Sequence, residues 1–377
     1  MVRKLAIGYI LILILFAFLT SLSEKYLKEK QYRKILFVLM CSFSVLAYYT
    51  LAETWEGNDL GRYLLSMNTY REMGLYRVLT EGLWKNTPLA SIEMYFFSLL
   101  GDNHLLPAFN AIVIWSIYFY ILIKEIVCDG YVKCRNAFFC LAVIVSYVNL
   151  FESISNVRYP LAAALFTLGI YLDCKKGKKI WGIILYTAAC LIHVGIIPLL
   201  VVRIMLTFKF LRNNRWLLIV LVALSFGFLS RFLLSSNNTF LNYLGEKTEM
   251  YSGVINSYGL LFSFGALCRY IGPLILELSC NTSEGDALEG ASSEERYQKL
   301  YDEVNKGVAV FGLSLLFLLP SFSYRMTPII AVGALSRIKY AHNTLLYYVG
   351  IAIMSLGIII SFYYNLKNYY IVWPFFN

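Results

Sequence analysis

The sequence predicts an all-α fold: a polytopic integral membrane protein with about 11–12 transmembrane helices. Of the 377 residues, 59% are hydrophobic and only 15% are charged, whereas a soluble domain averages about 25% charged residues. Apolar runs recur throughout the chain, and the cations behind the net charge of +10 gather mostly in the short segments between them. Because this distribution follows the positive-inside tendency, no nucleic-acid partner is expected. One polytopic domain covers residues 1–377.

The predicted membrane segments follow one another along the whole chain. They are Leu5–Leu22, Ile35–Ala52, Pro107–Val127, Ala137–Phe151, Arg158–Asp173, Ile180–Phe208, Trp216–Leu234, Tyr258–Leu278, Gly307–Leu319, Met326–Ser336 and Thr344–Tyr364. The first is too long for the apolar region of a signal peptide, and no small-residue cleavage site follows it, so we expect it to be retained. The amino terminus is placed outside, and residues 24–34 form a basic inner loop.

The apolar run at 180–208 has 29 residues, which suits either one long tilted helix or a tight hairpin. The two alternatives place everything downstream on opposite sides of the membrane. A hairpin leaves three cations outside and puts eight inside: Lys209, Arg212, Arg215, Arg296, Lys299, Lys306, Arg337 and Lys339. Since cytoplasmic segments are enriched in Lys and Arg, the charges favour a hairpin with Gly195 and Pro198 near its outer bend.

Two segments stand out between the predicted helices. Residues 53–106 form a large outer loop, in which Ser91–Leu100 is apolar but too short to span and is expected to be re-entrant or interfacial. Residues 279–306 form a polar cytoplasmic loop with seven acids and three bases. Within it, Ser292 and Glu295 have the spacing of a capping box for a short helix.

Motifs for soluble-type chemistry are absent from the sequence. It contains no G-x-x-x-x-G-K-[ST], H-E-x-x-H or G-x-S-x-G pattern, so ATP-driven transport and hydrolase chemistry have no support. The eight cysteines match no zinc spacing and avoid the loops placed outside, which indicates reduced structural thiols. No cofactor and no metal are expected.

An arginine and a histidine are predicted to lie at the same outer depth on two neighbouring helices. The lysines at 175–179 anchor the linker at the cytoplasmic face. At about 1.5 Å per residue, Arg158 lies about 24 Å above Cys174, and His193 about 21 Å above Lys179. An ionised group at such depth costs at least about 2.5–3.5 kcal/mol, so the pair indicates a functional site.

Further cations extend this candidate site. Arg231 and Arg325 are placed near the outer face, Arg62 in the outer loop and Arg269 near mid-membrane. Guanidinium groups bind diphosphates bidentately without losing their proton, so the set suits such an anion.

Structural roles remain open for each of these residues. Arg231 is equally compatible with snorkelling to the headgroups, Arg62 and Arg158 with ordinary loop cations, and His193 with a bond to a backbone carbonyl. Arg269 is compatible with an ion pair to Glu277. Arg203, near the inner edge, is expected to snorkel.

A glycosyl transfer needs a group that accepts the proton of the acceptor hydroxyl. His193, Asp59 in the outer segment and Glu152 at an outer helix end are the candidates for this role. The sequence does not choose among them. His104 and His342 are expected to be surface residues.

Several elements, taken in order, resemble the EpsG/Wzy-type polysaccharide polymerases. The first is the G-N-D-x-x-x-Y arrangement of residues 57–63, and the second is N-V-R-Y-P-L-A-A-A-L from Asn156. The third is the basic linker with A-x-x-I-H-x-G at residues 189–195. Residues 305–307 before an apolar run, Arg325 and the closing W-P-F-F resemble the carboxyl half, so the resemblance covers most of the chain.

The resemblance implies a glycosyltransferase of the bacterial inner membrane with its active site facing the periplasm. Such an enzyme makes a surface polysaccharide such as O antigen or capsule, transferring the growing glycan from undecaprenyl diphosphate to the next lipid-linked repeat unit. Arg158, Arg325 and Arg62 would hold diphosphates, and His193 would orient or deprotonate the acceptor. Flippase and chain-length regulator proteins are expected partners. The alternatives are a lipid-linked oligosaccharide flippase and a membrane acyltransferase.

Overall fold

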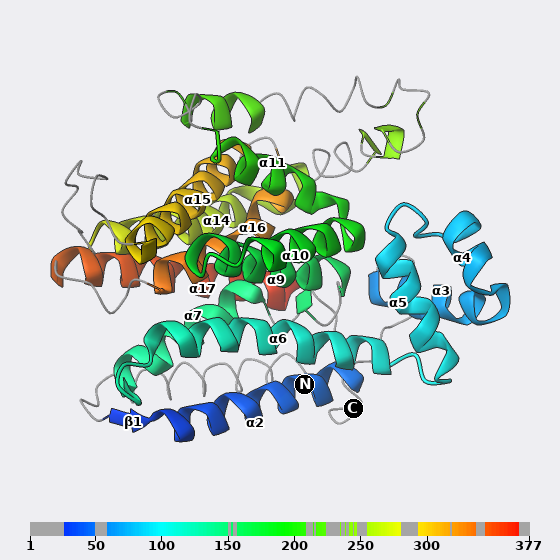
Figure 1. Ribbon diagram of the computed structural model, residues 1–377, viewed down its shortest axis with the longest axis horizontal. Coiled ribbons are helices and arrows are strands. Elements are labelled where there is room, and N and C mark those ends of the chain that lie inside the picture. Colours follow the sequence, from blue (N-terminus) through cyan, green and yellow to red (C-terminus); the bar gives the residue numbers. More distant parts are fainter. Residues whose placement is uncertain are drawn as a thin grey trace. The chain divides into compact units, whose positions relative to one another are not determined.

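The computed structural model (Figure 1) describes residues 26–49, 59–149, 152–153, 157–208, 214, 216–223, 234, 238, 241–243, 245–246, 255–279, 293–316, 319–336 and 344–368. Helices dominate these residues, so the prediction of a predominantly helical fold is confirmed. The single domain expected over 1–377 divides into two compact units. The first comprises Met1–Leu165, Ala188–His193 and Tyr363–Asn377, and the second comprises Phe166–Thr187 and Val194–Phe362.

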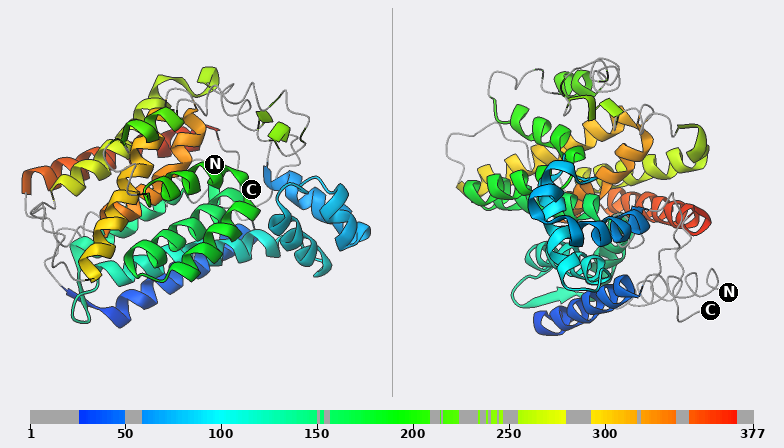
Figure 2. Two further views of the ribbon diagram at one scale, coloured as in Figure 1. Left: turned by 45° about the horizontal axis from the view of Figure 1, so that its top comes forward. Right: turned by 90° about the vertical axis from the view of Figure 1, so that its right-hand side faces the viewer.

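The first unit is built on a long pair of antiparallel helices. α2 (Glu29–Tyr48) and α6 (Leu105–Ile126) lie side by side in Figures 1 and 2. At one end, β1 (Tyr26–Lys28) pairs antiparallel with β2 (Tyr131–Lys133), which leads into α7 (Cys134–Val148). At the other end, the Tyr48 hydroxyl donates to Asp102 Oδ2 at 2.6 Å. These contacts hold the two helices in register.

The segment at 53–106, predicted to be a large outer loop, is mostly helical in its described part, residues 59–106. α3 (Asp59–Met73), α4 (Leu75–Glu81) and α5 (Pro88–Leu99) occupy most of it. The short apolar segment predicted at Ser91–Leu100 corresponds to α5. One face of α3 is buried: Leu60, Tyr63, Met67 and Tyr70 follow one another at helical spacing. These residues do not form a continuous apolar run in the sequence.

The second unit contains the remaining described helices. They are the π-helical turn η1 (Tyr171–Lys175), the 3₁₀ turn η2 (Val194–Ile196), α11 (Ile197–Met205), α14 (Ile255–Leu278), α15 (Ser293–Leu315) and α16 (Pro320–Leu335). Three helices have residues in both units: α9 (Arg158–Ile170), α10 (Lys179–Ile192) and α17 (Thr344–Asn368). α16 packs against both α14 and α15. At Gly333 on α16 the packing is so close that a Cβ would lie 2.4 Å from Asn305 Cγ.

The polar segment predicted as a cytoplasmic loop at 279–306 is not a loop throughout. α15 begins at Ser293 and continues without a break into the apolar segment that was expected to start at Gly307. Tyr301 and Val304 are buried in its polar half, so this half packs against the unit instead of standing away from it. The proposed capping residue Ser292 lies outside the described residues.

The run at 180–208 contains a chain reversal. α10 ends at Ile192, and α11 starts at Ile197 after the 3₁₀ turn. Tyr186 on α10 and Arg203 on α11 both bond the same oxygen of Asp173, at 3.1 Å and 3.0 Å. In one straight helix these residues would be about 25 Å apart along the axis. The single long helix is therefore excluded: the chain turns between α10 and α11.

The expected number of membrane spans is not confirmed. In the described part of the chain, one helix, α6, is long and apolar enough to cross a membrane. Shorter apolar helices occur at Asn136–Val148, Lys179–Ile192, Val194–Met205 and Leu345–Ile360. The helix break at His193 divides the apolar run at 180–208 into two shorter helices. The apolar segment that begins at Gly307 is the second half of α15, whose first half is polar. The predicted segment Leu5–Leu22 lies outside the described residues.

Candidate functional site

Arg158 is held at the start of α9 by side chains from the α3–α5 region. The residue is 5% exposed, its Nε donates to the Tyr63 hydroxyl at 3.2 Å, and its Nη1 donates to Thr87 Oγ1 at 3.2 Å. The guanidinium carbon lies 3.6 Å from the centre of the Trp84 ring and 5.2 Å from that of Tyr63. We call Tyr63, Trp84, Thr87 and Arg158 the Arg158 group.

The turn between α4 and α5 presents two members of this group. The Trp84 backbone N–H donates to the Tyr70 hydroxyl at 3.1 Å, which ties the turn to α3. The Thr87 hydroxyl donates to the Trp84 carbonyl at 3.1 Å, so its oxygen is oriented to accept from Arg158. The turn requires glycine at position 82, because a Cβ there would lie 2.3 Å from the Val78 carbonyl oxygen.

These contacts orient the Arg158 guanidinium. Tyr63 and Thr87 accept through neutral hydroxyls, and the aromatic faces attract a cation through their quadrupole, by about 2 kcal/mol or more when desolvated. Burial raises the pKa of the nearby Tyr70, while the positive charge of Arg158 acts in the opposite direction. A fixed, positively charged fork of this kind is suited to binding an oxyanion.

His193 lies beside the residue that follows Arg158. The rings of His193 and Tyr159 meet edge to face with their centres 5.1 Å apart. The His193 backbone N–H donates to the Ala189 carbonyl at 2.9 Å, which fixes the residue at the end of α10. Its side chain is buried. The structure thus brings His193 next to Tyr159, at the start of α9.

Three other residues of the first unit were predicted to belong to the site, and their positions differ. Asp59 is the first residue of α3, one helical turn before Tyr63, and its side chain is outside the description. Arg62, next along the same helix, is exposed and directed away from the buried face that carries Tyr63. Glu152 is buried shortly before α9.

Arg269 and Arg325 belong to the second unit. Arg269 is fully buried in α14, donates through Nη1 to the Tyr324 hydroxyl and lies over the Tyr324 ring at 4.3 Å. The carboxylate of Glu277, considered as an ion-pair partner of Arg269, lies 3.7 Å from Lys306 Nζ. Arg325 is half-buried in α16. Arg231 lies outside the described residues.

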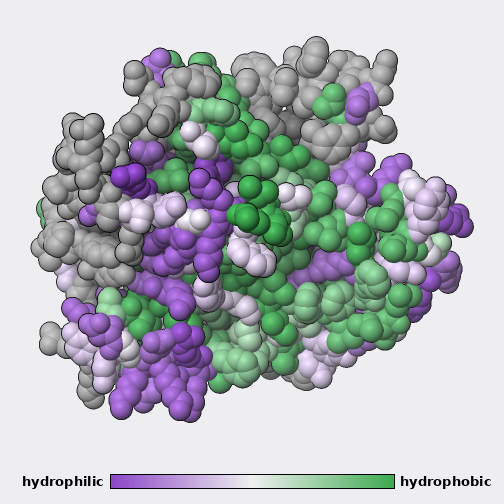
Figure 3. All heavy atoms as spheres, in the orientation of Figure 1, coloured by the Kyte–Doolittle hydropathy of each residue, from purple (hydrophilic) through white to green (hydrophobic). Residues whose placement is uncertain are grey.

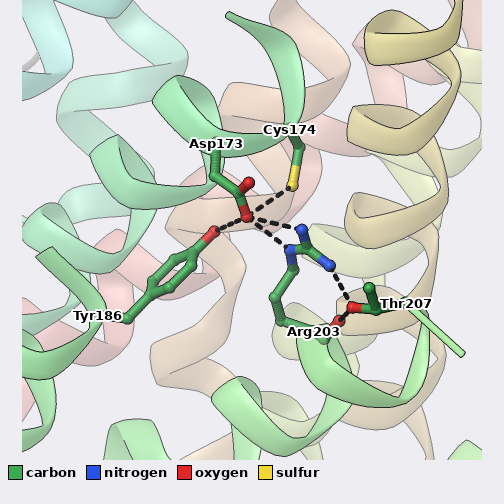
Figure 4. Close-up of polar contacts among 5 residues, drawn as sticks. All are labelled: Asp173, Cys174, Tyr186, Arg203 and Thr207. Atoms are coloured by element: carbon green, nitrogen blue, oxygen red, sulfur yellow. Dashed lines mark hydrogen bonds and ion pairs between the residues drawn. The ribbon is translucent and has the colours of Figure 1, made fainter. Parts of the chain in front are cut away.

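A second buried polar group surrounds Asp173 (Figure 4). Arg203 donates to Asp173 Oδ2 through Nε at 3.0 Å and Nη2 at 2.6 Å, and Tyr186 donates to the same oxygen. Arg203 Nη1 also donates to Thr207 Oγ1 at 2.8 Å. The expectation that Arg203 snorkels is therefore wrong. The π-helical turn Tyr171–Lys175 adds a residue to the helix, and it carries Asp173.

Glu93 on α5 is a titratable group that the site prediction did not use. Burial raises its pKa from 4.5 to about 7, partly offset by the neighbouring amide of Asn110 on α6. A carboxyl group with such a pKa exchanges protons near neutral pH. The sequence signal was present, since an acid stood alone within an apolar segment.

His104, predicted to be a surface residue, is instead half-buried. Its ring centre lies 6.1 Å from that of Tyr48.

Sequence reasoning missed Trp84 and Thr87 altogether. Thr87-Pro88 has the form of a helix start, with proline in the first turn, and this signal could have located the beginning of α5. No local pattern connects that turn with Arg158, which is 71 residues away from Thr87.

Comparisons with known proteins give no relative. No model of a protein family matches the chain, and no curated protein or solved structure matches it either.

Proposed function

We propose that this protein is a polymerase of a surface polysaccharide that acts at the outer face of the bacterial inner membrane. It would transfer a growing glycan from undecaprenyl diphosphate to the next lipid-linked repeat unit. The observation that carries the proposal is the Arg158 group together with His193, whose ring contacts Tyr159, the residue that follows Arg158. Tyr63 closes the G-N-D-x-x-x-Y pattern, Arg158 lies in the second element of the resemblance and His193 in the third, and contacts in the fold link the three.

Membrane embedding is part of the proposal. Large apolar side chains are exposed along several helices, which would be unfavourable in water and is expected in contact with lipid. On α10 they are Ile180, Trp181, Ile183, Ile184 and Leu191. Hydrophilic residues gather instead over β1 and the start of α2 (Figure 3), where a basic inner loop was expected.

The chemistry follows from the charges. The acceptor hydroxyl attacks the anomeric carbon of the donor glycan, the new glycosidic C–O bond forms, and the bond from that carbon to the diphosphate oxygen breaks. Arg158 would bind the departing diphosphate as its negative charge grows. His193, Asp59 and Glu152 remain the candidates for receiving the proton of the hydroxyl.

Deleting the gene tests the reaction class. A polymerase predicts surface glycan that stops at a single repeat unit, visible by gel separation of extracted polysaccharide. If repeat units instead accumulate inside the membrane and none reaches the outer face, the protein is a flippase. Full-length glycan in the deletion strain would contradict both functions.

A further inference from the structure

The indole N–H of Trp84 is buried without a hydrogen-bond partner. The residue is 7% exposed, and Nε1 meets no acceptor among the residues that the structure describes. Leaving a buried donor unpaired costs about 1–3 kcal/mol, and native proteins rarely carry such groups without a reason. A ligand that supplies the acceptor is one such reason.

The other polar groups of Trp84 and its ring already have partners. The backbone N–H and carbonyl of Trp84 are engaged by Tyr70 and Thr87. One face of the ring is covered by the Arg158 guanidinium at 3.6 Å, and the Tyr63 ring lies edge to face at 5.4 Å between centres. The unpaired donor is therefore at the edge of a ring that already holds a cation.

We infer that Trp84 Nε1 and Arg158 together bind one phosphate group of a diphosphate ester. An indole N–H and a guanidinium can only donate, so the ligand must supply acceptor oxygens. The adjacent positive charge favours oxygens that carry negative charge. The identification of this ester as a lipid carrier rests on the proposed function. Trp84 would thus be a ligand-binding residue as well as the platform for Arg158.

A second tryptophan provides a matched control. Trp115 on α6 is fully buried, and its Nε1 also lacks an acceptor in the described part of the chain. Its ring packs against Phe43 and Phe119, at 4.6 Å and 5.6 Å between centres, in an apolar environment. Trp115→Phe and Trp84→Phe remove the same unpaired donor, but only the second removes it beside Arg158.

The test measures binding of farnesyl diphosphate to the purified full-length protein in detergent, by calorimetry and by ligand-induced thermal stabilisation. Trp84→Phe is expected to weaken binding by about 10- to 100-fold, the equivalent of one hydrogen bond to a charged acceptor. Trp115→Phe is expected to bind like the wild type. Without ligand, both variants are expected to lower the unfolding temperature, because each loses ring volume from a buried position. Ligand-induced stabilisation is therefore measured for each variant relative to its own ligand-free unfolding temperature.

A second variant separates the N–H from the stacking of the ring. Replacing Trp84 with 3-benzothienylalanine puts sulfur in place of the indole N–H and keeps the bicyclic ring under Arg158. The inference requires this variant to bind as weakly as Trp84→Phe. Binding equal to the wild type, or no binding of farnesyl diphosphate to the wild type, would overturn it. Neither result bears on glycan length in the deletion strain, which tests the proposed function separately.

Discussion

The buried ion pair between Asp173 and Arg203 predicts that a substitution at either residue destabilises the protein. The expectation that Arg203 snorkels predicts almost no effect. Both side chains are at most 9% exposed, and Arg203 makes two of its hydrogen bonds to one carboxylate oxygen. Asp173→Asn leaves the guanidinium buried without this counter-charge, and Arg203→Met leaves the carboxylate with the Tyr186 hydroxyl and the weak Cys174 donor. Breaking a buried pair from one side costs about 3–5 kcal/mol.

The free energy translates into a measurable shift. For a unit of this size, about 3 kcal/mol lowers the unfolding midpoint by at least about 6 °C. The double variant Asp173→Asn/Arg203→Met is expected to lose much less than the two single losses combined, because it leaves no unpaired charge. Arg203→Lys keeps the charge but not the forked donation to Asp173 Oδ2, so it is expected to fall in between.

The assay is thermal unfolding of each purified variant in detergent, followed by the fraction of protein that stays monodisperse. Arg33→Lys is the matched control, since the ion pair of Arg33 with Glu29 is exposed and contributes little. The reasoning is refuted if both single variants unfold within about 1 °C of the wild type, or if their losses add in the double variant.

Three further predictions concern the α3–α5 region. Tyr63→Phe removes the hydroxyl that accepts from Arg158 Nε, so it should destabilise the protein by about 1–3 kcal/mol and shorten the glycan. The control Tyr76→Phe, at an exposed position, should have neither effect. Gly82→Ala puts a Cβ 2.3 Å from the Val78 carbonyl oxygen, so it should lower the unfolding temperature; an unchanged unfolding temperature would contradict the packing argument. Because the pKa of Glu93 is raised from 4.5 to about 7 in the folded state, the unfolded chain releases that proton first and stability falls as pH rises through this interval. Glu93→Gln should lack that part of the fall between pH 5 and pH 8, and an unchanged pH dependence would show that the carboxyl is not buried.

Helix existence was predictable because it depends on local apolar content. The predicted segments Pro107–Val127 and Tyr258–Leu278 lie close to α6 (Leu105–Ile126) and α14 (Ile255–Leu278). The helix α3 in the outer segment was not predicted, because its buried face is built partly from Tyr63 and Tyr70 and contains no continuous apolar run. The helical spacing of these buried residues could nevertheless have been recognised in the sequence.

The contacts of the candidate site could be anticipated only in part. Depth along two helices placed Arg158 and His193 at one level, but it gave no information about Trp84 and Thr87, which reach Arg158 through tertiary packing. Arg203 was misjudged because a position near an inner edge was taken to imply solvent access. The π-helical turn that carries Asp173 toward Arg203 has no sequence signal that would have revealed it.

The central claim is that Arg158 and His193 act in glycan polymerisation, and the most direct test is glycan chain length in cells that carry single substitutions. Arg158→Lys keeps the charge but loses the planar fork, and His193→Gln removes a group whose general-base contribution is typically about 10²–10⁴-fold. Arg77→Lys, at an exposed ion pair with Glu81, is the control. At equal protein abundance, we predict single units or short chains from the first two variants and full-length polymer from the control. Full-length polymer from both Arg158→Lys and His193→Gln would contradict the proposed site.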